Sequence, residues 1–287
     1  MATTIKTGFE KLRENLQITT LQSSTVSTRQ QNVREAVQQE FTVLTSFLAG
    51  SYARSTMIAP LKDSDIDIIV VLDPSYFSKY TPASLLDRLR AVLLRTYPKT
   101  PKISRNGQAV TITFTDFVVD VVPAFNRNGG GYLIPDSVNK RWISTDPTAH
   151  ASLLTAQNKA HDGSLVPLIK MIKGWNRIIN GAFTGFYLEL MTTDILTNVT
   201  ISDFPSGVRY VFDKGRDKIK YKQRDPAGFG GYINPLNNVN TVDDAVSRFT
   251  TAYNRAVKAE ELASANKIPA AFEEWRKIFD DYFPTYG

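Results

Sequence analysis

Three aspartates, Asp65, Asp67 and Asp120, are the residues whose type and spacing in this sequence best fit a catalytic site. Asp65 and Asp67 start an apolar run over residues 65–72 that is typical of a buried strand. Side chains alternate along a strand, so residues i and i+2 point to the same face. Two neighbouring carboxylates repel each other, and a divalent cation removes that conflict. Hard carboxylate oxygens favour Mg²⁺, which also keeps waters and substrate phosphates as ligands.

The third acid, Asp120, stands among four valines within residues 118–122. An isolated carboxylate in a strand core is costly to bury, so a shared metal or a proton-accepting role explains its presence. Two metal ions about 3.5–4 Å apart clamp the attacking and leaving oxygens of an in-line displacement. The three acids therefore predict phosphoryl-transfer chemistry with two Mg²⁺ ions, Mn²⁺ being the alternative ion.

A Gly-Ser turn precedes the first two acids. Gly50 lets the backbone approach a ligand closely, and the exposed N–H groups of such a turn bind anions. The hydroxyl of Ser51 is suited to donate to a phosphate oxygen, and Arg54 adds positive charge. Each of these motifs alone is more often a solvated surface feature. In this order and with these flanks, they predict a nucleotidyl-transfer site.

Strands and helices must position these residues. We expect strands over residues 42–48, 66–72 and 117–122, and a hairpin from Ile103 to Phe114 across the turn pair Asn106-Gly107. The apolar spacing predicts an α/β (α+β) fold in which the second half is helical. The expected helices are near Phe9–Leu16, and over Thr28–Phe41, Pro82–Tyr97, Leu165–Ile179, Phe186–Leu196, Val242–Ala263 and Pro269–Phe283.

Taken together, these stretches resemble a known family. The chain is similar to the bacterial cGAS/DncV-like nucleotidyltransferases (CD-NTases) of the DNA polymerase β-like superfamily, which make cyclic di- or trinucleotide signals in CBASS anti-phage defence. The resemblance spans most of the chain. It is carried by Ser27–Gln30, Gly50–Thr56, Asp65–Asp67, Asp120–Phe125, Trp142–Pro147 with His150, Lys173–Asn176 and Phe186–Glu189.

The family likeness implies an architecture and a reaction. It implies a polymerase β-like core with a mixed sheet in residues 1–145 and a C-terminal helical, OAS-like domain in residues 146–287, with the active site in the cleft between them. The implied reaction is attack of a ribose hydroxyl on the α-phosphate of an NTP with loss of pyrophosphate, and a second round that closes the ring. ATP, GTP, UTP and CTP are the candidate substrates, and a separate effector protein responds to the product.

The same likeness implies roles for individual residues. The three aspartates are the expected Mg²⁺ ligands, with Asp120 nearest the acceptor hydroxyl. Ser51 and Lys173 are the expected contacts of the donor triphosphate. A serine of the family that touches the nucleotide corresponds here to Gly185, with Thr184 beside it, so this chain departs from the pattern at that point.

Base recognition is less well defined by the sequence. Tyr187, Tyr210 and Tyr232 are candidates for stacking on a nucleobase, although aromatic residues are more often core packing. Asn158 is a candidate for reading a base edge, and a solvent-facing helix residue is an equally good interpretation.

Composition sets limits on the function. The 287 residues contain no cysteine and two histidines, which excludes disulfides and argues against a zinc site. No apolar stretch reaches about twenty residues, and the N-terminus lacks an apolar signal core. We therefore expect a cytoplasmic protein without a membrane span, and a monomer.

Charge also bears on partners. The net charge of +6 is moderate for the length and fits a basic cleft for triphosphates. The densest basic run, Arg209 to Arg224, is interrupted by acids, and we interpret it as a solvated hairpin or loop rather than a nucleic-acid contact. Duplex DNA binding is not expected.

Two alternatives to a cyclic-nucleotide synthase remain at the level of sequence. One is a nucleotidyltransferase that modifies an RNA, a protein or a small-molecule hydroxyl. The other is a catalytically dead nucleotide-binding module, against which the three retained acids argue. The glycine run at residues 129–131 lacks the helix and lysine of a P-loop, so we interpret it as a flexible turn.

Overall fold

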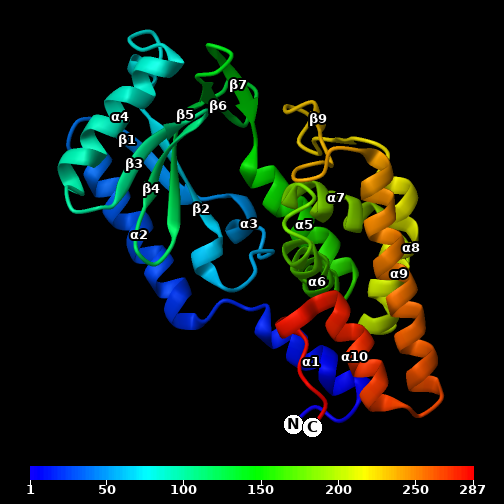
Figure 1. Cartoon of the computed structure of the whole chain (residues 1–287). Coiled ribbons are helices and arrows are strands. Elements are labelled where there is room, and N and C mark those ends of the chain that lie inside the picture. Colours follow the sequence, from blue (N-terminus) through cyan, green and yellow to red (C-terminus); the bar gives the residue numbers. More distant parts are fainter. The chain divides into compact units, whose positions relative to one another are not determined.

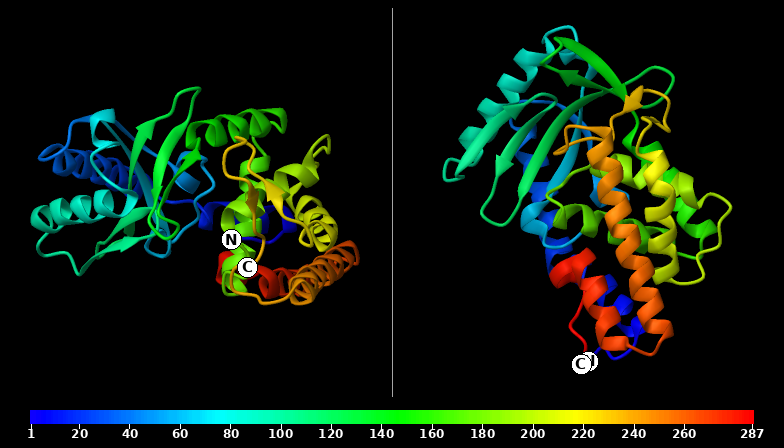
Figure 2. Two further views of the ribbon diagram at one scale, coloured as in Figure 1. Left: turned by 90° about the horizontal axis from the view of Figure 1, so that it is seen from above. Right: turned by 45° about the vertical axis from the view of Figure 1, so that its right-hand side comes forward.

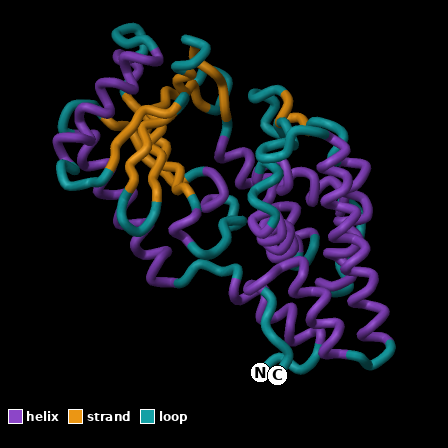
Figure 3. Tube along the Cα trace, viewed as in Figure 1, coloured by secondary structure: helices purple, strands orange, loops and turns teal.

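The computed structural model describes all of residues 1–287, and these form two compact units. The α/β unit comprises Ile18–Leu153 and Pro226–Gly230. The helical unit comprises Met1–Gln17, Leu154–Asp225 and Gly231–Gly287. In Figure 3 the strands of the large sheet all belong to the first unit, and the second is built almost entirely from helices.

The α/β unit is organised around one mixed, seven-stranded sheet (Figure 1). Its main path runs β1-β2-β5-β4-β3, and β6 and β7 extend it from β5. The pairing of β2 with β5 is parallel, and all other pairings are antiparallel. The strands are β1 (Val43–Leu48), β2 (Asp65–Leu72), β3 (Lys102–Asn106), β4 (Ala109–Thr113), β5 (Val118–Asn126), β6 (Tyr132–Asp136) and β7 (Arg141–Thr145).

Two long helices, α2 (Thr20–Gln38) and α4 (Pro82–Thr96), pack on one face of this sheet. Figure 2 shows them on the same side of the sheet in both views. We call this the helix-covered face. The inward side chains of β2 and β5, among them Ile66, Ile68 and Val119, form a large apolar core with the two helices. Both helices begin with a threonine N-cap and a capping box, which satisfies their first free N–H groups.

The opposite face of the sheet carries a smaller apolar cluster that includes Ile69, Val122 and Ala124. These residues alternate with the core residues along the same strands, as the pleat requires. We call this the acid-bearing face, because Asp65, Asp67 and Asp120 have the same parity as these three residues. One face of the sheet therefore packs against helices, and the other carries the three acidic side chains.

The helical unit has two aromatic clusters. Trp175, Phe183, Phe212 and Phe249 contact one another around the middle of the unit. The second cluster joins Phe9 of the first helix to the last helix. The helices are α1 (Ile5–Asn15), α5 (Pro147–Ala160), α6 (Leu165–Ile178), α7 (Gly185–Leu196), α8 (Phe204–Lys218), α9 (Val242–Ser264) and α10 (Ile268–Phe279), together with a short hairpin of β8 (Gln223–Arg224) and β9 (Tyr232–Ile233).

These bounds differ from the sequence-based division at residue 145 in three places. The α/β unit extends to Leu153, within α5, and it also includes Pro226–Gly230. Residues 1–17 belong with the helices at the end of the chain. This last difference follows from packing, because Phe9 stacks edge-on against Trp275 at a ring-centroid distance of 4.8 Å. Contacts between segments that are remote in sequence are invisible to local periodicity.

Candidate active site

The three aspartates lie on two neighbouring strands. In the parallel pair β2–β5, Asp67 is the register partner of Asp120, and Asp65 is the partner of Val118. Adjacent strands lie about 4.8 Å apart, so the backbones of Asp67 and Asp120 are direct neighbours. All three acids are on the acid-bearing face, opposite the core positions of Ile66 and Ile68. The predicted strands and the shared face of the first two acids are confirmed by this register.

Gly50 packs directly against Asp67. A Cβ atom on Gly50 would lie 1.7 Å from the Oδ2 of Asp67, and the φ of Gly50 is +59°. Only glycine fits this position, because it tolerates positive φ and leaves room for the carboxylate. The backbone N–H of Ala49 also donates to the carbonyl oxygen of Asp67 at 2.8 Å. The expected Gly-Ser turn is in fact the start of a short helix, α3 (Gly50–Ala53), a segment too brief to show helical periodicity in the sequence.

Ser51, within this short helix, and Arg54, its C-cap residue, are half-buried. The carbonyl oxygen of Ser51 accepts hydrogen bonds from the N–H groups of Thr56 and Met57 at 2.9 and 3.1 Å. These bonds fix the loop that leads from α3 toward β2. The positive charge of Arg54 acts on Asp67 and partly offsets the effects that raise its pKa. The structure thus places Gly50 and Arg54 near Asp67.

The acids form an electrostatically strained group. Burial, the charge of Asp120 and, to a smaller degree, the charge of Asp65 raise the pKa of Asp67 to about 6. The side chain of Asp65 still reaches solvent, yet desolvation first and the charge of Asp120 second raise its pKa as well. Carboxylates whose pKa is raised by burial and by one another are typical of functional sites. The arrangement gains stability from any cation that binds among them.

Thr111 was not anticipated from the sequence. It lies on β4 directly opposite Asp120 in the antiparallel pairing, and its Oγ1 is 2.5 Å from the Oδ1 of Asp120. A carboxylate only accepts, so the threonine hydroxyl is the donor. The alternation of Thr111, Ile112 and Thr113 indicates a strand with one polar face, but nothing local in the sequence identifies the acid that this face meets.

The fit of a metal ion can be judged from this donor set. Nowhere in the chain do three acidic or histidine side chains already converge into a closed metal site. The side chains that share the acid-bearing face are nevertheless hard oxygen donors, and the raised pKa values of Asp65 and Asp67 show that their negative charge is under-compensated. Such oxygen donors suit a hard divalent cation that keeps waters and phosphate oxygens as its other ligands. The residues therefore fit the expected ion without defining its identity.

The predicted triphosphate contact, Lys173, lies on α6 in the helical unit. Its Nζ is 2.9 Å from Oε1 of Glu189 on α7, and the side chains of the two residues are 13% and 2% exposed. A Cβ atom on Gly185 would lie 3.7 Å from the Cε of Lys173. The structure thus brings Lys173 close to the position where the family carries a serine. Glu189 ends the Phe186–Glu189 stretch, but nothing in the sequence indicates that it pairs with Lys173.

Lys170 lies one turn before Lys173 and is 6% exposed. Its Nζ donates to Oε1 of Gln17 at 2.7 Å. Desolvation first, then the charges of Lys173 and Arg13, lower its pKa to about 8. The first turns of α6 therefore bury two lysines in different settings, one with a carboxylate partner and one with a neutral amide.

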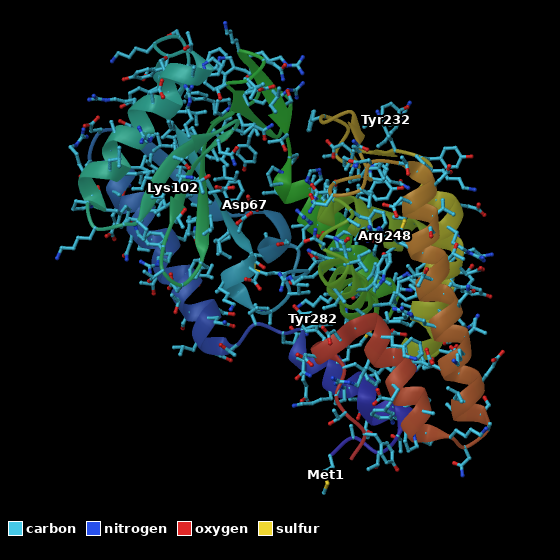
Figure 4. All side chains as sticks on the ribbon, viewed as in Figure 1. Met1, Asp67, Lys102, Tyr232, Arg248 and Tyr282 are labelled. Atoms are coloured by element: carbon cyan, nitrogen blue, oxygen red, sulfur yellow. The ribbon has the colours of Figure 1, made fainter.

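The candidates for base recognition are placed less favourably. Tyr187 is fully buried, and its hydroxyl lies 2.8 and 2.7 Å from the carbonyl oxygens of Lys218 and Tyr221, which share its single O–H donor. Burial raises its pKa to about 12. Its surroundings favour the packing interpretation over stacking on a base. Tyr232, labelled in Figure 4 on the β8–β9 hairpin, is 61% exposed.

Asn158 and Thr184 have local roles at helix ends. The Oδ1 of Asn158 accepts from the backbone N–H of Val166 at 2.9 Å, which ties the end of α5 to the start of α6. Thr184 is the N-cap residue of α7, although its side chain makes no capping hydrogen bond. Its backbone N–H donates to the carbonyl oxygen of Pro235 at 2.9 Å. Of these two residues, Thr184 is therefore the better candidate for a polar contact with a nucleotide.

The basic run Arg209–Arg224 is not a hairpin or loop along most of its length. Residues 204–218 form α8, whose buried stripe includes Val208, Val211 and Phe212. This amphipathic stripe overrides the impression given by the charges. Most of the cations have acidic partners: Arg209 with Glu260, Lys214 and Arg216 with Asp213, Lys218 with Asp194, and Lys220 with Asp217. Paired cations on a helix surface favour a solvated face over a nucleic-acid contact.

Comparisons with known proteins identify the relatives of this chain. Residues 2–158 match the family described as the Second Messenger Oligonucleotide or Dinucleotide Synthetase (SMODS) domain. A probable cyclic nucleotide synthase of Bacillus cereus is 27% identical over 273 residues, which cover 83% of this chain and 81% of that protein. A cyclic AMP-AMP-AMP synthase of Acinetobacter sp. is 26% identical over 302 residues, which cover 98% and 86%.

Solved structures share the fold. The Escherichia coli CdnC in its complex with HORMA-deltaN superposes with a TM-score of 0.74 at 18% identity, covering 97% of this chain and 98% of that one. The Vibrio cholerae cyclic AMP-GMP synthase DncV gives a TM-score of 0.70 at 15% identity, covering 98% and 87%. The expected polymerase β-like nucleotidyltransferase architecture with a mixed sheet is confirmed. None of the helices is both long and apolar enough to cross a membrane.

Proposed function

Because the chain belongs to the Second Messenger Oligonucleotide or Dinucleotide Synthetase family, we propose that it condenses nucleoside triphosphates into a cyclic di- or oligonucleotide that signals in CBASS anti-phage defence. The observation that carries the proposal is the group of three acids on one sheet face, with Asp67 and Asp120 in direct register and Gly50 packed on Asp67. The names of the Bacillus and Acinetobacter relatives support a cyclic product. We propose that the matched residues 2–158 and the remaining helices both take part, since the relatives match along most of the chain.

Asp65, Asp67 and Asp120 are the residues that would hold two Mg²⁺ ions. When bound, the ions neutralise charge that develops on the attacking and leaving oxygens. The reacting ribose hydroxyl forms a new bond to the α-phosphorus, and the bond from that phosphorus to the bridging oxygen of pyrophosphate breaks. We propose that Asp120 takes the proton of the attacking hydroxyl on Oδ2, and the hydrogen bond from Thr111 to Oδ1 supports this role. In a second round the free 3′ or 2′ hydroxyl of the linear product attacks the α-phosphorus of its own 5′-triphosphate, a second pyrophosphate leaves, and the ring closes.

Lys173 and Ser51 are the proposed contacts of the donor triphosphate. Lys173 is mostly buried, and the carboxylate of Glu189 lies 2.9 Å from its Nζ. Thr184 and Arg54 are proposed as further nucleotide contacts. These roles carry over from the family pattern, residue by residue.

The partners follow from the reaction. The substrates are drawn from ATP, GTP, UTP and CTP, and the proposed site of action is the cytoplasm, where these are made. A separate effector protein would receive the signal through the nucleotide product. The E. coli CdnC relative is in complex with HORMA-deltaN in its solved structure, which supports a protein partner for this chain too. We propose that the synthase itself works as a monomer.

A product assay tests the proposal. Purified protein is incubated with Mg²⁺ or Mn²⁺ and all four labelled NTPs, treated with phosphatase, and the products are identified by mass spectrometry. A phosphatase-resistant cyclic species that disappears in the Asp65→Asn and Asp67→Asn variants supports the synthase and names its bases. Linear products alone would favour the alternative in which the enzyme transfers a nucleotide to an RNA, protein or small-molecule hydroxyl. Product formation that survives both substitutions would refute the acid site.

A further inference from the structure

The inference concerns the side chain that faces Asp120 from the next strand. Thr111 and Asp120 are register partners in the β4–β5 pairing, and both are half-buried on the acid-bearing face. The hydroxyl of Thr111 donates to Oδ1 of Asp120 at 2.5 Å, within the range of strong hydrogen bonds to a charged acceptor. No other hydrogen bond to the side chain of Asp120 is present. One of its two carboxylate oxygens is thus held and the other is left for a ligand.

Asp120 lies between a repulsive and an attractive neighbour. Its register partner on β2 is Asp67, and its register partner on β4 is Thr111. Without a donor on the β4 side, the carboxylate of Asp120 would have no hydrogen bond to fix its rotamer beside the negative charge of Asp67. The hydrogen bond selects one of these rotamers. It does so from a strand that carries none of the three acids, so it supports the site from outside the proposed ligand set.

The fold does not need this hydroxyl for its packing. The core contacts of β4 are made by Val110 and Ile112, which point to the helix-covered face and are fully buried. Thr113 has the same parity as Thr111 and is equally half-buried, but it pairs with Val118 and makes no side-chain hydrogen bond. Valine has the same shape as threonine and at least the same preference for strands. Replacing either threonine by valine therefore tests the hydroxyl with little change in shape.

We propose that Thr111 is a positioning residue, whose hydroxyl holds Oδ1 of Asp120 and thereby presents Oδ2 to the divalent cation and to the attacking ribose hydroxyl. The inference rests on the proposed function, since it assigns Thr111 a task only if Asp120 serves the metal site. Partners that orient metal-ligating carboxylates typically change metal affinity or activity by about 10- to 100-fold when they are removed. Loss of the hydroxyl should therefore weaken the site while leaving the fold intact.

The experiment compares Thr111→Val, Thr111→Ser and the matched control Thr113→Val. Mn²⁺ binding is measured by electron paramagnetic resonance in the presence of a non-hydrolysable ATP analogue, and steady-state kinetics and thermal unfolding are recorded for the same samples. In Thr111→Val, Mn²⁺ affinity falls by about 10-fold and kcat by 10-fold or more, while the melting temperature and the KM for the NTP stay near those of the native protein. Thr111→Ser restores most of both losses, because its hydroxyl reaches the same carboxylate oxygen. Thr113→Val behaves as the native protein does.

Asp120→Asn separates the inference from the function on which it rests. If Asp120→Asn abolishes Mn²⁺ binding and turnover but Thr111→Val changes neither, Thr111 is not a positioning residue and the acid site stands. If Asp120→Asn itself retains both, the proposed function fails at this residue. Equal losses in Thr111→Val and Thr113→Val, together with a lower melting temperature, would also overturn the inference, because they would show that β4 itself is weakened.

Discussion

Lys170 and Lys173 provide a sharp test of the electrostatics of the helical unit. Both lysines are largely buried and lie one turn apart on α6, so any general effect of losing a lysine from this helix applies to both. Their partners differ. Lys173 faces the carboxylate of Glu189, whereas Lys170 faces the neutral amide of Gln17. Substitution by methionine, which keeps the length and flexibility of the side chain, should therefore change stability in opposite directions.

The size of each effect follows from the structure. Burial lowers the pKa of Lys170 from 10.5 to about 8, a shift of 2.5, which corresponds to about 3 kcal/mol at 1.36 kcal/mol per unit. Residual solvent screening reduces this to about 2 kcal/mol, which is the stability that Lys170→Met should gain at pH 7. Gln17 is exposed and can bond to water instead. Lys173→Met removes the ammonium group that lies 2.9 Å from the buried carboxylate of Glu189 and should cost about 3 kcal/mol.

The pH dependence shows whether the charge of Lys170 stabilises or destabilises the folded protein. The folded pKa of Lys170 is lowered, so its charged form is penalised in full below about pH 8. The penalty declines as pH rises toward 10.5, where the unfolded chain also loses the proton. The advantage of Lys170→Met over the native protein should therefore shrink to less than half by about pH 9.5.

Urea unfolding at pH 7 and pH 9.5, followed by tryptophan fluorescence, measures these differences. Trp175 and Trp275 both belong to the helical unit and report its unfolding. Lys159→Met, at an exposed position on α5, is the control and should change stability by less than about 0.5 kcal/mol. The double variant Lys173→Met/Glu189→Leu should recover most of the loss in Lys173→Met. If Lys170→Met is destabilising at pH 7, or if its gain does not depend on pH, the assignment of an uncompensated buried charge is wrong.

Three further outcomes are expected. Asp67→Asn should abolish product formation and yet stabilise the metal-free protein at pH 8, because burial and Asp120 raise the pKa of Asp67 to about 6. The charged form of Asp67 destabilises the fold in full above that pH, so the stability gained by the substitution should vanish near pH 4. Urea unfolding in the presence of a chelator measures this. Gly50→Ala should lose both activity and stability, since its Cβ would meet Oδ2 of Asp67 at 1.7 Å, whereas Gly107→Ala, where nothing lies within 4 Å, should keep its activity in the same assay. Duplex DNA added to the product assay should leave the rate unchanged, because the cations of α8 are paired with acids; a rate that rises with DNA and falls with added salt would contradict this.

Much of the α/β unit could be predicted because its signals are local. The i, i+2 spacing of Asp65 and Asp67 in a β-branched run indicates a strand with both acids on one face, and β2 confirms it. The pair Asn106-Gly107 predicted the turn between β3 and β4. What could not be predicted is which strands become neighbours. The register of Asp67 with Asp120 skips over two intervening strands, β3 and β4.

The same limit explains the residues that sequence reasoning missed. Thr111 acquires its partner through the β4–β5 register, and Glu189 acquires Lys173 through the packing of two helices. Neither residue stands out by type or by spacing. The misreading of α8 had another cause, because its apolar positions Val208, Val211 and Phe212 do follow a helical period but are embedded among charges. The many charged residues of this run led to its interpretation as a hairpin or loop, although its apolar residues have helical spacing.

The division of the sheet into two faces explains how the fold accommodates a repulsive group of acids. On β2 and β5, every second residue enters the large apolar core with α2 and α4, and these contacts hold the strands together whatever the alternate positions carry. Asp67 alone opposes folding at neutral pH by about 3 kcal/mol when its pKa is about 6. A single fully buried isoleucine such as Ile66 or Ile68 contributes a comparable amount in the other direction. The acids thus lie on strands whose apolar packing offsets their repulsion. A cation bound among them would remove that repulsion, and the free energy so gained would add to its binding affinity.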